Sequence, residues 1–450
     1  MSDERALAWT HLLPPEASLI IPNGPDWLPR TLASKSDESA VKVLVLHDWS
    51  ATAHYDLSHY QGIALVSEKP ISRFTPESLG FHFTRQFAVF PGWHDARFLV
   101  PLDNNRIAAG ALSMERPFRQ MSRLKHHALR LMFRTGYSNV CRGFLILALR
   151  HQSPLETLLS KVCGGHFHRL ALCAGRAGDL RKVNAVALTL SGQPIAYLKL
   201  ASNRHSREAL NREAKALSDL ATTTLSNTVP KLLAFQEDSR HATLVVEAGP
   251  DRVAPTHLTK AHFQWLSNLA DYSRSSKPFA QSLVAHAMEE DWADIKDRVH
   301  PTWMKRIDHA LARIHRELGN ATIPLTMAHG DFAPWNIRQI SDTLIYVFDW
   351  EMYKHECTPM FDAFHFRFIT STLLGRGILP NEVTRWFTQL TPHLPTGASP
   401  SYMPAFFCAY LVITALTYLK AVVARGESKD DLVLSAVAPM LDTVDYWWAS

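Results

Sequence analysis

The sequence lacks the features that mark secreted, disulfide-bonded or membrane-spanning proteins. Only five of its 450 residues are cysteine, and no two have the Cys-x-x-Cys spacing of a redox or zinc motif. Residues 1–16 contain acids and prolines where a signal peptide has a basic start and an apolar run. The longest apolar run, residues 406–419, is shorter than the ~20 residues that cross a bilayer, and it predicts a buried helix. We therefore expect reduced thiols and a cytoplasmic location.

The sequence also lacks an excess of charge. Its net charge is +5, with 20% charged and 46% hydrophobic residues, which is typical of a globular protein with an ample core. A nucleic-acid partner would need a concentrated basic face, so the charge gives no reason to expect one. Because single domains seldom exceed about 250 residues, we expect two or three domains. The oligomeric state is not indicated.

Residues 1–112 show short apolar runs separated by proline- and glycine-containing breaks, which predicts a small α/β module. No glycine-rich phosphate loop follows any of the runs, so the role of this module stays unknown. We expect its strands at residues 18–22, 41–46, 62–67 and 97–100.

Residues 113–165 predict a basic helical connector. Positions 116–150 hold eight Lys or Arg and no acid, and apolar side chains recur between them at near-helical spacing. The arginines that can share one face are Arg116, Arg119, Arg123 and Arg130, and the interleaved apolar residues include Phe118, Met121, Leu124 and Leu131. Such a helix can dock on the rest of the protein with its arginines in water. Alternatively, residues 116–134 can lie on an anionic membrane, which would make the protein peripheral at the inner membrane.

The next segment, residues 166–249, predicts a lobe of five strands and one helix. Two early strands are joined by a turn containing Gly175 and Gly178, whose backbone N–H groups can lie over phosphates. A later strand contains Lys199, and a charge inside an apolar strand calls for a partner. The helix that follows carries Glu213. The last strand ends in a hinge-like turn at Val246, Glu247 and Gly249.

The residues of greatest chemical interest lie between positions 327 and 352. This stretch holds a His-Gly-Asp triplet, an asparagine five residues after the aspartate, and a second aspartate that ends an apolar strand: His329, Gly330, Asp331, Asn336 and Asp349. The asparagine and the second aspartate stand at the two ends of a predicted hairpin, so they can converge. Carboxylate and amide oxygens suit a hard cation such as Mg²⁺, and a further carboxylate can accept a proton from a hydroxyl.

This stretch resembles the aminoglycoside phosphotransferase and choline kinase family, which has a protein-kinase-like fold. The protein-kinase pattern is His-Arg-Asp, four residues, Asn, then Asp-Phe-Gly. Here it becomes residues 329–331, Asn336, and Asp349-Trp350-Glu351, with Asp362 at the position of the family's later aspartate. The resemblance covers about residues 166–370 by motif, and the rest of the chain to the C-terminus by general pattern.

The resemblance implies a fold, two cofactors and roles for particular residues. The fold would be α+β and bilobal, with an antiparallel N-lobe at residues 166–249 and a mostly helical C-lobe at residues 250–450. ATP and Mg²⁺ would be the cofactors. The implied roles are catalysis for Asp331, metal binding for Asn336 and Asp349, and nucleotide binding for Gly175, Gly178, Lys199, Glu213, Val246, Glu247 and Gly249. Lys199 and Glu213 would form an ion pair, whereas the roles of Glu351 and Asp362 stay open between structure, metal and substrate.

The favoured function is therefore phosphoryl transfer from ATP to a hydroxyl of a small molecule or a glycan. Family members with an N-terminal extension of this kind are associated with bacterial glycan gene clusters, which points to polysaccharide metabolism. One alternative is an inactive nucleotide-binding scaffold of a glycan assembly complex, although the intact Lys199, Asp331, Asn336 and Asp349 argue against it. A protein kinase is the other alternative, but Asp-Phe-Gly and Ala-Pro-Glu landmarks are absent. The identity of the acceptor is not encoded in these motifs.

Overall fold

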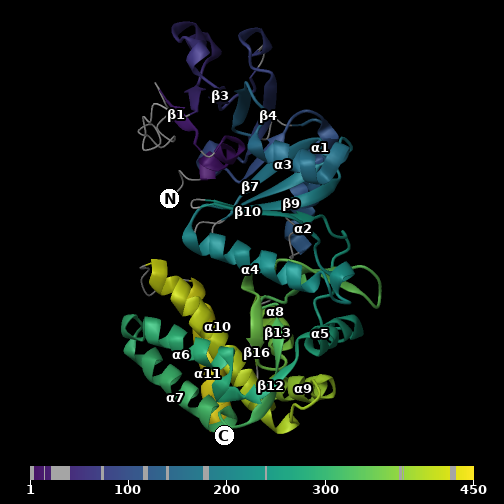
Figure 1. The fold of residues 1–450 in the computed structure, drawn as a ribbon, viewed down its shortest axis with the longest axis vertical. Helices are drawn as coiled ribbons and strands as arrows, with labels where there is room; N and C mark the ends of the chain where they lie inside the picture. Colours follow the sequence, from purple (N-terminus) through teal and green to yellow (C-terminus); the bar gives the residue numbers. More distant parts are fainter. Residues whose placement is uncertain are drawn as a thin grey trace. The chain divides into compact units, whose positions relative to one another are not determined.

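The computed structural model describes residues 5–449 except 15, 22–40, 72–75, 115–119, 138–140, 176–181, 239–240, 374–377, 379 and 426–431. The chain forms two compact units (Figure 1). Unit 1 comprises residues 1–210 and 232–248, and unit 2 comprises residues 211–231 and 249–450. Both helices and strands are abundant, as expected for the α+β class.

Unit 1 is built on one sheet of 11 strands in the order β1-β2-β3-β6-β4-β5-β7-β8-β9-β11-β10. The pairs β1–β2 and β2–β3 are parallel and the others are antiparallel. The strands are β1 (Ser18–Ile20), β2 (Lys42–Leu46), β3 (Gly62–Ser67), β4 (Phe83–Phe90), β5 (Phe98–Pro101), β6 (Phe144–Leu149), β7 (Arg169–Ala174), β8 (Val183–Leu188), β9 (Pro194–Ala201), β10 (Leu232–Glu237) and β11 (Ala242–Glu247).

The four strands expected in residues 1–112 appear as β1, β2, β3 and β5. The expected helical connector at 113–165 is wrong in its middle, because β6 runs there between β3 and β4. All six residues of β6 are apolar and buried, since the strand is covered on both faces of the sheet. A short apolar run of this kind has no alternation, so its periodicity does not distinguish a buried strand from a buried helix.

Helices cover both faces of this sheet. The 3₁₀ helix η1 (Arg5–Leu12) and α3 (Pro154–Cys163) pack with the core on one face, and α1 (Asn105–Ala111) and α2 (Gln120–Arg134) pack with the core on the other. A two-pronged ion pair ties α3 to β4: the Arg85 Nε and Nη2 atoms donate to the Glu156 carboxylate at 2.7 and 2.9 Å. Such a bidentate, mostly buried pair fixes the angle of the helix on the sheet.

The N-terminal strands and the lobe that follows them are continuous. Strand β5 pairs with β7 through Phe98 opposite Cys173 and Leu99 opposite Leu172. The helix α1 also lies against the turn after β8, where a Cβ on Gly110 would come within 2.0 Å of the Gly192 carbonyl oxygen. Only glycine allows this approach of two backbones. Whether residues 1–112 and 166–249 fold as separate domains stays a prediction, but they share one sheet.

Unit 2 is mostly helical, with a three-stranded sheet β12-β13-β16 and a hairpin β14–β15. Helix α4 (Arg204–Leu220) belongs to both units by its residues. The other elements are α5 (Lys260–Ser273), β12 (Ser275–Pro278), α6 (Leu283–Ile295), α7 (Pro301–Leu318), β13 (Thr322–Ala328), β14 (Ile337–Gln339), β15 (Ile345–Val347), β16 (Lys354–Cys357), α8 (Phe361–Leu373), α9 (Pro380–Leu390), α10 (Met403–Arg425) and α11 (Leu432–Ala449).

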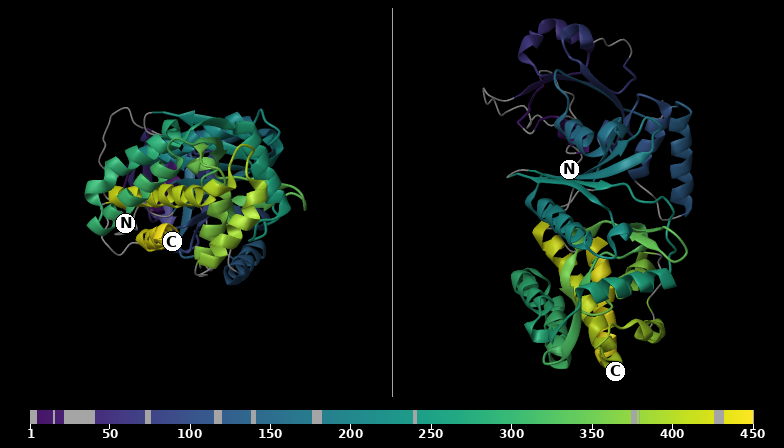
Figure 2. Two further views of the ribbon diagram at one scale, coloured as in Figure 1. Left: turned by 90° about the horizontal axis from the view of Figure 1, so that it is seen from below. Right: turned by 45° about the vertical axis from the view of Figure 1, so that its right-hand side comes forward.

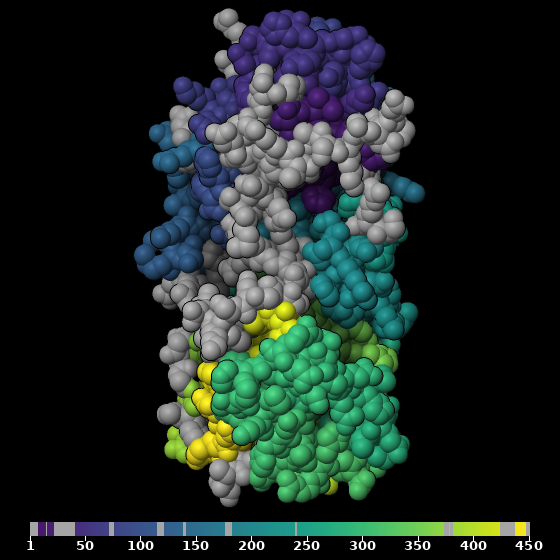
Figure 3. All heavy atoms as spheres, turned by 90° about the vertical axis from the view of Figure 1, so that its left-hand side faces the viewer, coloured from purple at the N-terminus to yellow at the C-terminus, as the bar shows by residue number. Residues whose placement is uncertain are grey.

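Helix α10 is the core of unit 2. It packs against α6, α7, α8 and α11, and α6 and α7 form an outer face of the unit (Figure 3). Within the described residues, the stretch Pro400–Val423 alone is long and apolar enough to cross a membrane, and most of it is buried inside the protein. The expected buried helix at 406–419 is confirmed, because aromatic and aliphatic side chains surround it on all sides.

Candidate active site

The loop from residue 329 to residue 336 joins β13 to the hairpin β14–β15, and the hairpin brings its two ends together. The Phe348 N–H donates to the Asn336 carbonyl oxygen at 3.0 Å. Asn336 therefore lies next to the residue that precedes Asp349, as the sequence predicts. Phe332 anchors the loop to α5, because its ring is fully buried and stacks on that of Trp265 with centroids 5.5 Å apart.

A buried carboxylate holds the start of the loop. Asp362, in the first turn of α8, accepts the backbone N–H of His329 at 2.7 Å and that of Gly330 at 3.0 Å. Burial raises the pKa of the Asp362 carboxyl, against the lowering influence of His329 and the two N–H donors. The position that the sequence left open between structure, metal and substrate thus has a direct structural contact with the loop.

The glycine of the His-Gly-Asp triplet is required by its backbone. Gly330 has a φ of +84°, and a Cβ there would lie 2.0 Å from the Met352 carbonyl oxygen. An arginine, as in protein kinases, would not fit at this position. His329 is fully buried and braces the loop: its Nε2 atom lies 3.0 Å from the Phe348 carbonyl oxygen, and its Nδ1 atom accepts the Asp331 N–H at 3.2 Å. The two ring nitrogens thus contact the two chain segments that flank the hairpin.

Both oxygens of the Asp331 carboxylate have a partner in the structure. The Asn336 amide donates to Oδ2 at 2.7 Å and to the Asp331 carbonyl oxygen at 2.9 Å. The His365 Nε2 atom lies 3.0 Å from Oδ1. About a third of the Asp331 side chain, 32%, stays exposed, whereas that of His365 is 4% exposed. The carboxylate is therefore fixed in orientation and still open to an incoming hydroxyl.

Sequence reasoning did not assign His365 or Tyr410 to the site. The Tyr410 hydroxyl of α10 lies 3.4 Å from the His365 Nδ1 atom. Burial raises the pKa of Tyr410 well above its usual range, so the hydroxyl keeps its proton and can donate it to Nδ1. His365 would then carry its proton on Nε2 and donate to Asp331. The available signal was the position of His365, three residues after Asp362 and hence one helical turn along.

Three carboxylates converge near the second aspartate. One oxygen each from Glu213, Asp349 and Glu351 lie within 4.8 Å of one another, and Glu213 is buried. Asp349 adopts the left-handed conformation, with φ 72° and ψ 61°, which turns the chain into the 3₁₀ helix η13 (Trp350–Met352). Oxygen ligands concentrated in this way fit a divalent cation, which would offset their mutual repulsion. The donor set of the three carboxylates therefore suits Mg²⁺. A metal-binding role for the Asn336 amide oxygen stays a prediction.

The residues expected to bind nucleotide fall in both units. Gly175 directly follows β7, where its N–H donates to the Lys182 carbonyl oxygen at 3.0 Å and a Cβ would lie 2.3 Å from that oxygen. Gly178 lies outside the described residues. Lys199 is half-buried on β9, opposite Asn184 of β8 and Leu244 of β11.

The expected hinge follows β11. Val246 and Glu247 are the last residues of that strand, and the Ala248 N–H donates to the Ile195 carbonyl oxygen at 3.0 Å. Gly249 begins the next segment of unit 2, where a Cβ would lie 2.3 Å from the Tyr346 ring. Because Lys199 belongs to unit 1 and Glu213 to unit 2, their ion pair stays a prediction.

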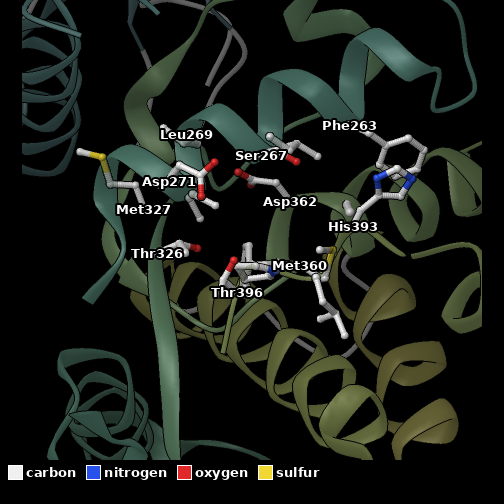
Figure 4. Close-up of a pocket in the computed structure, with 17 residues that line it drawn as sticks. Phe263, Ser267, Leu269, Asp271, Thr326, Met327, Met360, Asp362, His393 and Thr396 are labelled. Atoms are coloured by element: carbon white, nitrogen blue, oxygen red, sulfur yellow. The ribbon is translucent and has the colours of Figure 1, made fainter. Parts of the chain in front are cut away.

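A cavity of about 170 Å³ lies beside the loop in unit 2 (Figure 4). Residues of α5, β13, the start of α8 and the segment 393–396 line it, and Asp362 reaches its wall. Asp331, Asn336 and Asp349 do not line it. The cavity is therefore not the place where an acceptor hydroxyl would meet the Asp331 carboxylate.

The fold and the loop together define a small-molecule phosphotransferase with a kinase-like fold. Residues 184–366 match the phosphotransferase enzyme family. Within this segment the chain is similar to that family. No curated protein matches the chain.

Three solved structures illustrate the likeness of the fold. A choline kinase from Streptococcus pneumoniae is 12% identical, with a TM-score of 0.46 over 65% of this chain and 100% of that one. An aminoglycoside phosphotransferase in a ternary complex with ADP and hygromycin B is 11% identical, with a TM-score of 0.43 over 65% and 96%. A putative fructosamine-3-kinase from Haemophilus somnus is 12% identical, with a TM-score of 0.39 over 64% and 96%. At these identities the likeness concerns the fold alone.

Replacing Asp362 by alanine should destabilise the protein strongly. The change would leave the buried N–H groups of His329 and Gly330 without their acceptor, at a cost of ~1–3 kcal/mol for each buried donor. Urea denaturation would measure the loss in the free energy of unfolding. Asp342→Ala is the matched control, because that carboxylate is 87% exposed and its ion pair with Arg252 should contribute less than ~1 kcal/mol. Equal losses in both variants would contradict the assigned role of Asp362.

Proposed function

We propose that the protein transfers the γ-phosphoryl group of ATP to a hydroxyl of a small molecule or a glycan. The observation that carries this proposal is the Asp331 carboxylate, held from two sides and still partly open to solvent. Asp331 orients the acceptor hydroxyl and accepts its proton as the oxygen attacks phosphorus. This positioning lowers the entropic cost of bringing the hydroxyl into line.

Asn336 and Asp349 would hold Mg²⁺, and Glu351 and Glu213 stand close enough to share in holding it. When bound, the ion would offset the negative charge of the nucleotide phosphates. By the resemblance, Lys199, Gly175 and Gly178 would bind the phosphates of the nucleotide. The backbone at Val246, Glu247 and Gly249 would meet the base.

His365 acts as a positioning residue for Asp331. Its ring is buried, and it meets Asp331 on one side and Tyr410 on the other. An imidazole N–H at Oδ1 keeps the carboxylate from rotating, so that Oδ2 stays directed by Asn336. The contact supports catalysis rather than a scaffold role, because a protein without turnover has no use for an oriented base.

The finer proposal for the acceptor is a glycan hydroxyl in bacterial polysaccharide metabolism, with a cytoplasmic location. The N-terminal extension supports it, because the family resemblance associates such extensions with glycan gene clusters. ATP consumption measured with and without candidate sugars would test the acceptor class. Stimulation by a free amino alcohol such as choline, with none by sugars, would overturn the glycan assignment and leave phosphotransfer standing.

Changing Asp331 to asparagine should lower kcat by ~10²-fold or more, since general-base contributions run to 10²–10⁴. Nucleotide affinity should change little, because the amide keeps the size of the side chain. Coupled assay of ADP release would measure kcat, and titration with ATP would measure binding. Turnover equal to that of the unchanged protein would show that Asp331 is not the base.

Changing Asp349 to alanine should abolish the Mg²⁺ dependence of nucleotide binding. Mg²⁺ is expected to raise ATP affinity in the unchanged protein by about tenfold or more, because the ion would offset the charge of both the phosphates and the carboxylates. ATP titrations with Mg²⁺ and with EDTA would measure the ratio. Asp342→Ala, an exposed aspartate at the turn before β15, should keep the full ratio and serves as the control.

Changing His365 to phenylalanine should lower kcat by ~10-fold while the KM for ATP stays within about twofold, because the variant loses only the orientation of the base. His365→Gln should recover part of kcat, since its amide can again donate to Asp331. A purely structural role for His365 would instead give equal losses in both variants, together with a lower unfolding temperature.

A further inference from the structure

The helix α2 presents its apolar side chains outward. Met121, Leu124 and Leu131 are 67%, 64% and 61% exposed, and Tyr137, just after the helix, is 56% exposed. Among the described residues, no other helix has more than one large apolar side chain this exposed. Isolated exposed leucines are ordinary, but several on one helix mark a contact surface.

These side chains form one stripe. Positions 121, 124, 128 and 131 follow the i, i+3, i+7 spacing of a single helix face, and Ala128 is exposed between the larger residues. We call Met121, Leu124, Ala128 and Leu131 the outer stripe of α2. The helix lies at the margin of unit 1 (Figure 2, right).

The opposite face of α2 is anchored. Phe133 is buried and meets Phe90 edge-on with centroids 6.4 Å apart. The His126 Nε2 atom lies 2.8 Å from the Leu112 carbonyl oxygen. The packed side is therefore already occupied, and the outer stripe cannot turn inward without breaking these contacts.

The arrangement differs from the sequence expectation. Arg123 and Arg130, which were expected in water opposite an apolar face, are half-buried, whereas Met121 and Leu124 are exposed. Arg116, Arg119 and Phe118 lie outside the described residues. The reason is that the side of α2 that carries Leu129 and Phe133 packs against apolar residues of α1 and the sheet.

The charge around the outer stripe is of one sign. Residues 120–134 contain four basic residues and no acid. Lys125 and Arg134 are exposed beside the stripe. A second copy of the same helix would bring like charges together, which opposes pairing of α2 with itself. An apolar stripe flanked by cations matches the surface of a bilayer that contains anionic lipid.

We propose that α2 docks on an anionic membrane surface, with the outer stripe inserted among the lipid chains and Lys125 and Arg134 at the headgroups. Tyr137 suits the same level, since tyrosine favours the interface between water and hydrocarbon. Binding through one such helix is reversible. Unit 1 would then be held at the surface through α2, independently of any phosphoryl transfer.

Co-sedimentation of the full chain with vesicles tests the proposal. The protein should bind vesicles of phosphatidylcholine and phosphatidylglycerol in equal parts, and bind phosphatidylcholine vesicles at least ~10-fold less, because the cations contribute only with anionic lipid. Binding should fall as added salt shortens the screening length. Absence of binding to the mixed vesicles at low salt would overturn the proposal, and so would equal binding to both kinds of vesicle.

Two variants locate the contact. Leu124→Gln with Leu131→Gln removes apolar area from exposed positions, so the fold should persist while vesicle binding falls about tenfold or more. Lys125→Glu with Arg134→Glu should weaken binding and reverse its preference for the anionic vesicles. Leu283→Gln with Leu344→Gln removes two exposed leucines from other elements and should leave binding unchanged. An equal loss in this control would refute the assignment to α2.

A partner other than lipid would give a different pattern. If the outer stripe covers a second copy, light scattering would show concentration-dependent dimers that Leu124→Gln with Leu131→Gln dissociates, without binding to either vesicle. That result would replace the membrane with a protein interface.

Discussion

The site depends on one contact. The buried Asp362 carboxylate accepts hydrogen bonds from two backbone N–H groups of the loop, those of His329 and Gly330. A helix and a loop that are separated by more than 30 residues meet at this one side chain. Burying the carboxylate without these donors would cost free energy, and so would burying the N–H groups without the carboxylate. The loop therefore has one low-energy path over α8. This path of the loop also fixes the position of Asp331, which follows Gly330.

From this anchor the other contacts follow in order. His365 lies one turn further along α8 than Asp362, so the helix that holds the backbone of the loop also orients its carboxylate. Asn336 closes the loop onto Asp331 from the other end. Gly330 makes the tight turn between His329 and Asp331. The same short helix thus sets both the path of the loop and the direction of its reactive group.

Much of this could be predicted from the sequence because the decisive signals are local. The spacing of Asp331 and Asn336 along the chain predicted that they lie together, and polar residues between apolar runs predicted the hairpin. The strands β2 and β3 were visible as apolar runs between breaks. Contacts that depend on tertiary packing were not visible. Strand β6 has no alternation, and the outward turn of Leu124 depends on which neighbours α1 and the sheet supply.

The role of His365 shows the same limit at the level of one residue. A histidine in an apolar stretch is most often a packed core residue, and its position three residues after Asp362 is the one local signal that distinguishes it. Only the fold brings Tyr410, from the helix that begins at Met403, to its other ring nitrogen. The proposed positioning role of His365 therefore depends on the contact between α8 and α10, which no sequence motif marks.

The pairing of β5 with β7 has a consequence for any shortened form of the protein. Strand β7 is buried along nearly its whole length, and β5 satisfies part of its outer row of backbone groups. A chain cut before residue 166 would expose that row as a long, apolar sheet edge. Such edges recruit strands from other molecules, so the truncated kinase-like part would tend to aggregate. The N-terminal strands therefore act as a protective border for the lobe that follows them, whatever else they do.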